Sequence, residues 1–66
     1  MEIIVNGQPT TCPDTCSMQQ LLDQLGIPLP GTAVARNETV VRKAAYATTP
    51  LAAGDRIEII RAVAGG

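Results

Sequence analysis

A single amphipathic helix is encoded by the stretch SMQQLLDQLG, residues 17–26. Apolar residues recur in it at positions i, i+3, i+4 and i+7, which places them in one stripe along a helix: Met18, Leu21, Leu22 and Leu25. Polar residues occupy the opposite side of the helix. The whole stripe is therefore predicted to lie in a hydrophobic core.

Residues that typically begin and end helices stand at the two ends of this segment. Ser17 can cap the first turn, and Gln20, three residues later, can complete a capping box. Gly26 stands where a left-handed C-cap belongs, and Ile27 is placed for the hydrophobic contact that accompanies such a cap. Pro28 cannot continue a helix. These signals bound the helix more sharply than any other element of the chain.

Short strands are predicted on both sides of the helix. Before it, an extended run over residues 1–5, the turn Asn6-Gly7 and a return over residues 8–12 are typical of a β-hairpin. After it, further strands are predicted at residues 32–36, 39–42 and 56–62. Residues 43–50 are ambiguous and can hold a short helical turn. A sheet with one helix on one face is the α+β architecture that this order favours.

The alternation of side chains along the first and last strands separates a core face from an open face. The residues predicted to face the core are Ile3, Val5, Ile57 and Ile59. Ile4 and Ile60 then lie on the open face. If the two strands are neighbours, Ile4 and Ile60 form one apolar patch near the chain end, which would be a candidate docking surface. Otherwise they are two isolated exposed residues that need no explanation. Because the register cannot be read from the sequence, both interpretations stay open.

The composition argues against several classes of function. Tyr46 is the one aromatic residue and the formal charge is −1, so neither stacking platforms nor a basic surface for nucleic acid is present. No apolar run is long enough to span a bilayer, and no secretory signal opens the chain, so a cytoplasmic protein without a membrane partner is predicted. The chain has no histidine, and its carboxylates are scattered. We therefore predict no catalytic residue, no metal site and no bound cofactor.

Cys12 and Cys16 are the only cysteines. A reducing compartment disfavours a disulfide, and no histidine or second cysteine pair completes a zinc site, so both are predicted to be ordinary thiols. One reservation concerns Cys16, because a position just before a helix can stabilise a thiolate.

The sequence ends in Gly65-Gly66 after a β-rich apolar run. Residues without a Cβ atom can enter a slot that a larger side chain would block. An exposed terminal carboxylate can itself be the reacting group, whereas the plainer interpretation is a mobile chain end. We predict a folded domain over residues 1–62 and a flexible tail over residues 63–66.

Five segments match the pattern of a known family in order and over the whole length: MEIIVNG (1–7), LLDQL (21–25), AVARN (33–37), GDRIEII (54–60) and VAGG (63–66). Together they resemble the ThiS family, the sulfur carriers of bacterial thiamine biosynthesis. The pair Ala45-Tyr46 departs from it, since many relatives have a tryptophan-containing segment there. The resemblance implies a ubiquitin-like β-grasp fold, in which a small mixed sheet has one main helix packed on one face.

The same resemblance implies a carrier rather than an enzyme. An E1-like adenylyltransferase would use ATP and magnesium to adenylate Gly66, because a free carboxylate with a pKa near ~3.5 is ionised and unreactive. A cysteine-persulfide sulfur donor would displace AMP and leave a thiocarboxylate, which would deliver sulfur to thiazole synthase. The residues that would enter the partner active sites, reaching about 13 Å if extended, are Val63, Ala64, Gly65 and Gly66.

Three other functions stay open at this point. Sulfur carriers of molybdopterin synthesis share the fold and the tail, although they are generally longer and the segment at residues 33–37 favours the thiamine type. A protein modifier would join Gly66 to lysines of its targets, and the single lysine, Lys43, counts weakly against chain formation. A plain interaction module would have an inert tail.

Overall fold

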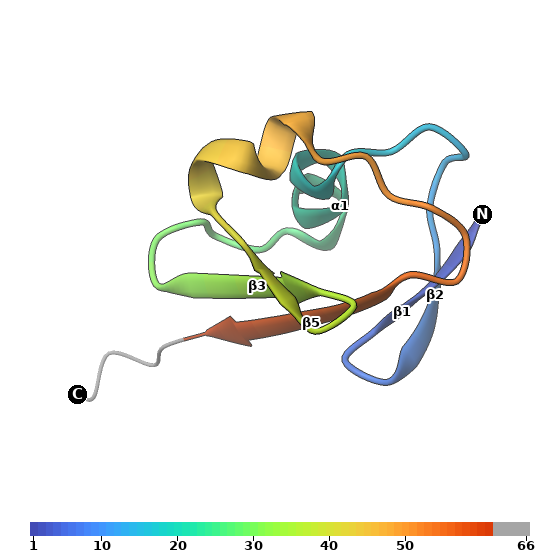
Figure 1. Ribbon diagram of the computed structural model, residues 1–66, viewed down its shortest axis with the longest axis horizontal. Coiled ribbons are helices and arrows are strands. Elements are labelled where there is room, and N and C mark those ends of the chain that lie inside the picture. Colours follow the sequence, from blue (N-terminus) through green and yellow to red (C-terminus); the bar gives the residue numbers. More distant parts are fainter. Residues whose placement is uncertain (62–66) are drawn as a thin grey trace.

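A computed structural model describes residues 1–61, with one five-stranded sheet crossed by a helix (Figure 1). The elements in chain order are β1 (Glu2–Val5), β2 (Gln8–Thr11), α1 (Met18–Leu25), β3 (Thr32–Arg36), β4 (Thr39–Val41), the 3₁₀ helix η1 (Lys43–Thr48) and β5 (Arg56–Arg61). The predicted elements agree with these to within one residue at almost every end. Residue 62 and the predicted tail at residues 63–66 lie outside the described residues.

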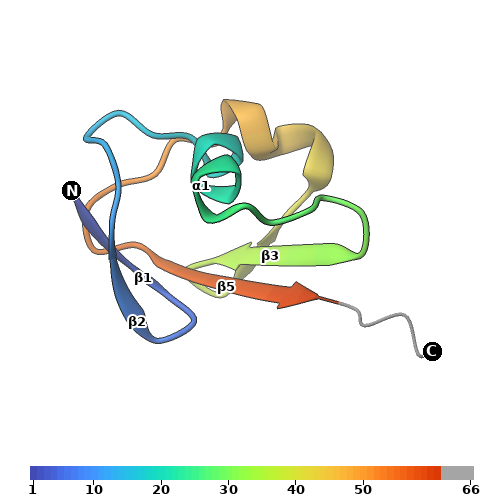
Figure 2. The same ribbon diagram turned by 180° about the vertical axis from the view of Figure 1, so that it is seen from behind.

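The sheet is mixed, and its strand order is β2-β1-β5-β3-β4. The central strand β5 is parallel to β1 and antiparallel to β3. In both views from the side, α1 and η1 lie on the same face of the sheet, and no described element covers the other face (Figures 1 and 2). The predicted α+β fold, a small mixed sheet with one main helix on one face, is therefore confirmed.

The helix ends follow the sequence signals. The Ser17 hydroxyl accepts a hydrogen bond from the Gln20 backbone N–H at 3.1 Å, and the Gln20 side chain accepts one from the Ser17 N–H at 2.8 Å. Gly26 adopts a left-handed conformation with φ of 68°. Beyond it, the Ile27 N–H reaches back to the Leu22 carbonyl at 3.0 Å, as in a Schellman motif. Both predicted caps are confirmed.

The core lies between α1, η1 and the covered face of the sheet. All four strand residues predicted to face it are buried: Ile3, Val5, Ile57 and Ile59. Three residues of the apolar helix stripe, Met18, Leu21 and Leu22, are buried, whereas the fourth, Leu25, is 38% exposed. The prediction for Leu25 is therefore wrong. After the left-handed turn at Gly26, Ile27 packs against the core at this end of the helix instead.

Asp55 is the one buried charged residue among residues 1–61. Its carboxylate accepts hydrogen bonds from the Asn37 amide at 3.0 Å and from the Ala52 backbone N–H at 2.8 Å, and it pairs with the Arg36 guanidinium at 3.3 Å. The Asn37 side chain also accepts from the Arg56 N–H at 2.9 Å. This network joins the segment around Asn37 to the start of β5, and these are two of the segments on which the family resemblance rests.

Candidate functional site

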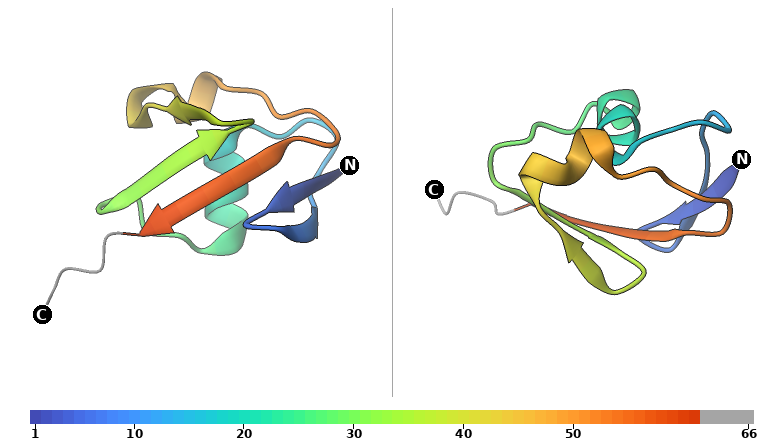
Figure 3. Two further views of the ribbon diagram at one scale, coloured as in Figure 1. Left: turned by 60° about the horizontal axis from the view of Figure 1, so that its bottom comes forward. Right: turned by 45° about the horizontal axis from the view of Figure 1, so that its top comes forward.

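The strand β5 leads towards the predicted tail. It begins beside β1 in the middle of the sheet and ends on the side of the molecule away from the N-terminus (Figure 3). Pairing with β1 stops where Val5 faces Ile57, so β5 continues four residues further, about 13 Å at 3.3 Å per residue, to Arg61. The predicted site residues beyond it lie outside the described part of the chain: Val63, Ala64, Gly65 and Gly66.

The register of β5 separates the two residues of the predicted docking patch. Both lie on the open face of the sheet, but Ile4 faces Arg56 on β5, whereas Ile60 faces Ala33 on β3. Ile4 is half-buried and Ile60 is 64% exposed. Because Arg56 and Ile60 are four residues apart, about 13 Å along the strand, the structure does not bring Ile4 and Ile60 together.

Ile60 instead belongs to an apolar strip that runs over β5, β3 and β4 on the open face. Cross-strand pairing places Ile60 beside Ala33, and Ala35 beside Val40, which is 73% exposed. We call these four residues the open-face strip. The sequence reasoning missed it, although the two-residue turn after Arg36 fixes the register of β3 with β4 and could have revealed it.

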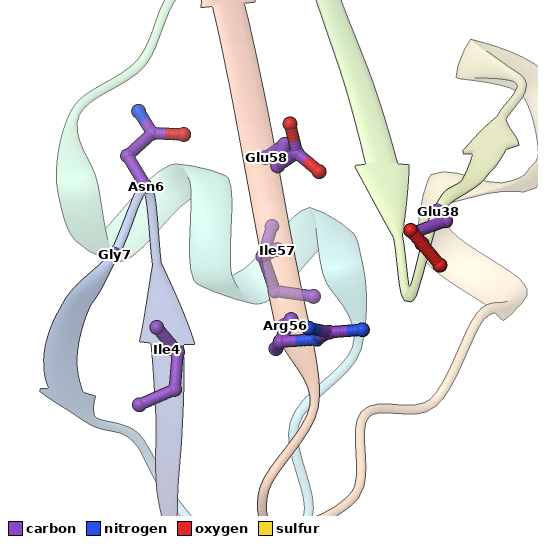
Figure 4. A pocket seen from close by; sticks show the side chains of 7 residues that line it. All are labelled: Ile4, Asn6, Gly7, Glu38, Arg56, Ile57 and Glu58. Atoms are coloured by element: carbon purple, nitrogen blue, oxygen red, sulfur yellow. The ribbon is translucent and has the colours of Figure 1, made fainter.

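A hollow of about 300 Å³ lies at the other end of the open face (Figure 4). It is lined by Ile4, Asn6, Gly7, Glu38, Arg56, Ile57 and Glu58. In the close view Arg56 lies between Ile4 and Glu38, with Glu58 further along the same strand, and neither carboxylate forms an ion pair with Arg56 within the described residues. Its volume is at the lower end of the range for small-molecule sites.

The two cysteines do not form a reactive site. Cys12 and Cys16 are free and only 3% and 5% exposed. Burial raises the pKa of the Cys16 thiol, and the neighbouring Cys12 thiol raises it further. A raised pKa keeps the thiol protonated and weakly nucleophilic. The prediction of ordinary thiols agrees with this, and the reservation about a stabilised thiolate at Cys16 is wrong because burial outweighs the nearby helix terminus.

Residues 1–61 contain no group of three or more side chains able to hold a metal ion. In the same part of the chain, no helix has the length and apolar character needed to cross a membrane. The described residues therefore form a sheet with one uncovered face. Its central strand, β5, extends beyond β1, and the Gly-Gly sequence follows it in the chain.

Comparison with known proteins decides which family has this arrangement. The model of the ThiS family matches residues 3–66, nearly the whole sequence and including the Gly-Gly end. The chain belongs to the ThiS family. The sulfur carrier protein ThiS of Escherichia coli (strain K12) is 32% identical over 66 residues and is covered along its whole length.

Solved structures agree with this ThiS-family assignment. The crystal structure of the thiamine biosynthesis protein (ThiS) from Geobacter metallireducens aligns with a TM-score of 0.85 and 28% identity, with both chains fully covered. The β-grasp prediction is thus confirmed. The matched family and these two relatives are of the thiamine type, so the predicted membership of the ThiS family, rather than of the molybdopterin carriers, is confirmed.

Two longer relatives carry the name thiazole synthase. Those of Paramagnetospirillum magneticum and Magnetococcus marinus are 32% and 33% identical over 66 residues. The ThiS-family chain spans about a fifth of the length of each, 20% in both cases. In these proteins a segment similar to this whole chain is therefore part of a larger polypeptide.

Proposed function

We propose that Gly66 carries the sulfur. An E1-like adenylyltransferase uses ATP and magnesium to adenylate its carboxylate, and the outer sulfur of a cysteine-persulfide donor displaces AMP to form an acyl disulfide. A second thiol then cleaves the S–S bond, forms a disulfide with the donor sulfur and releases the Gly66 thiocarboxylate, which passes its sulfur to thiazole synthase in the cytoplasm. The observation that carries this proposal is the extent of the family match, which continues from β5 through Gly65 to Gly66. The chain itself binds no cofactor in this scheme, and neither nucleic acid nor a membrane takes part.

The chemistry divides naturally between the carrier and its partners. An ionised carboxylate resists attack, so it must first be joined to a better leaving group, here AMP. Among residues 1–61 the one buried carboxylate, Asp55, is fully engaged in holding the fold. The electrostatic stabilisation of the transition state therefore comes from the activating enzyme, which must bind Gly66 in a narrow site. The carrier supplies the reacting group and presents it.

The two longer relatives support thiazole synthase as the acceptor of the sulfur. Each is named thiazole synthase and contains a segment similar to this chain over all 66 residues. Joining two modules in one polypeptide raises the effective concentration of each near the other. Such an arrangement is expected for a carrier whose cargo is consumed by that enzyme.

The mass of the intact protein tests the proposal. After incubation with the activating enzyme, ATP, the sulfur donor and a thiol reductant, the mass is expected to rise by the difference between one sulfur and one oxygen atom, and fragmentation should place the change on Gly66. Omitting ATP should prevent the change. An unmodified Gly66 in the presence of demonstrably active enzyme and donor would contradict the proposal.

We propose that the partner enzymes dock on the open face near the end of β5. A protein that holds Gly66 must lie close to Arg61, and on the other face the sheet is already covered by α1 and η1. The open-face strip puts the exposed Ile60 beside Ala33 at that end. Ile4, at the hollow, then provides a second and more distant contact, separate from Ile60.

Ile60→Glu tests this docking surface. Because Ile60 is 64% exposed, the substitution should leave the fold intact while placing a charge in an apolar contact. We expect the KM for the carrier in adenylation to rise about tenfold, equivalent to about 1.4 kcal/mol, with kcat little changed. Leu25→Glu is the matched control, because Leu25 is an exposed leucine on the helix side. Equal KM values for both variants would contradict docking at Ile60.

A further inference from the structure

The two edges of β5 are held in different ways. On one edge, β3 pairs with β5 from Ile57 to the last residue of the strand, Arg61. On the other edge, β1 pairs only as far as Val5 and then turns away at Asn6-Gly7, where φ is 49° and 79°. The second half of β5, from which the chain continues towards Gly66, therefore has no strand of the described sheet on that edge.

The side chain of Asn6 takes the place of the missing strand. Its Oδ1 accepts a hydrogen bond from the Ile59 backbone N–H at 2.8 Å, and its Nδ2 donates one to the Ile59 carbonyl at 3.2 Å. The backbone N–H of Asn6 also donates to the Ile57 carbonyl at 2.9 Å. One amide group thus satisfies both backbone groups of Ile59, as a residue of a paired strand would.

A turn residue alone does not need these contacts. Asparagine before glycine is favoured in a two-residue hairpin turn for its tolerance of positive φ, and this is the plainer account of Asn6. Yet the Asn6 amide bonds to a residue 53 positions away in the sequence rather than to its own turn. The contacts with Ile59 therefore add a tertiary role to the local one.

We propose that Asn6 is a positioning residue for sulfur transfer, because its side chain holds the last part of β5 in the sheet and so fixes the position of Arg61, after which the sequence continues to Gly66. The inference rests on the proposed function of Gly66. Gly66 lies five residues beyond Arg61, within at most about 17 Å of chain, so a displacement of Arg61 shifts the region that the reacting carboxylate can reach. Misplacement of a reacting group by about 1 Å can cost 10²-fold in rate.

Asn37 supplies a matched control. It also lies in a two-residue turn with φ of 49°. Its side chain also makes two hydrogen bonds, with the Arg56 N–H at 2.9 Å and the Asp55 carboxylate at 3.0 Å. Asn37, however, holds the start of β5, whereas Asn6 holds its end. Alanine at either position removes two side-chain hydrogen bonds, but only Asn6→Ala releases the end that leads to Gly66.

The experiment compares Asn6→Ala with Asn37→Ala at a temperature at which both variants are folded. For Asn6→Ala we expect kcat for adenylation to fall about tenfold, with little change in the KM for the carrier. For Asn37→Ala we expect lower stability but an unchanged kcat. Amide hydrogen exchange, measured by NMR, should accelerate at Ile59, whose N–H donates to the Asn6 side chain, in Asn6→Ala and not in Asn37→Ala. Asn6→Asp retains the acceptor for the Ile59 N–H and should lie between the wild type and Asn6→Ala in both measurements.

Several results would overturn the inference. It fails if exchange at Ile59 is the same in Asn6→Ala and the wild type, or if Asn37→Ala lowers kcat as much as Asn6→Ala. Should Asn6→Ala not fold, Asn6→Asp decides by the same two measurements. If the wild-type chain is not adenylated at all, the proposed function of Gly66 fails, and faster exchange confined to the end of β5 would still establish that Asn6 holds this strand.

Discussion

Replacement of Gly66 with alanine is expected to lower the rate of adenylation by about 10²-fold, since a displacement of about 1 Å at a reacting group can have this effect. The added methyl group must fit in a site that admits glycine, and it displaces the carboxylate from the position of attack. The whole described core lies within residues 1–61, so the unfolding temperature should not change. Comparison of kcat/KM for ATP–pyrophosphate exchange with the thermal unfolding curve checks both expectations.

A second variant distinguishes two explanations for an active Gly66→Ala protein: either the site of the activating enzyme is wider than proposed, or Gly66 is not the residue that reacts. Addition of one residue after Gly66 moves the carboxylate by a full residue and should abolish adenylation, whatever the width of the site. If Gly66→Ala remains active and the extended chain is inactive, the site is wider than proposed but the reacting group is correct. If both variants keep full activity, Gly66 is not the residue that is adenylated.

The elements set by local signals could be predicted from the sequence, and their tertiary partners could not. Ser17 and Gly26 bound the helix through contacts with residues at most four positions away, so their roles were visible in the sequence. The separation of Ile4 from Ile60 depends instead on how far β1 runs beside β5, which involves residues more than 50 positions apart. Register of this kind is set by packing across the sheet.

Two asparagines, Asn6 and Asn37, also make contacts with residues distant in the sequence that local signals do not predict. The sequence explains Asn6 by the turn Asn6-Gly7, and that explanation is sufficient without any distant contact. Asn37 stood out only as part of a segment shared with the family. The structure adds what each side chain bonds to: Ile59 for Asn6, and Asp55 with Arg56 for Asn37. The partners of a polar side chain depend on the fold, so no local pattern predicts them.

The sequence predicts that Leu25 of α1 is buried, whereas the structure leaves it exposed. Comparing Leu21→Ala with Leu25→Ala tests which is correct. Leu21 is 0% exposed and Leu25 is 38% exposed. We expect Leu21→Ala to lower the free energy of unfolding by about 2–5 kcal/mol, the usual range for a fully buried leucine. We expect Leu25→Ala to cost less than about 1 kcal/mol, as for a substitution away from the core. Urea unfolding followed by circular dichroism measures both.

The comparison isolates burial because both variants exchange leucine for alanine on the same helix, so the change in helix propensity nearly cancels. A single core in a domain of 66 residues rarely supplies more than about 3–5 kcal/mol, so Leu21→Ala should leave much of the protein unfolded. Its adenylation should then fall in proportion to the folded fraction, because Gly66 itself is unchanged. Equal losses of stability in the two variants would show that Leu25 is buried in solution and that the full apolar stripe expected from the sequence is correct.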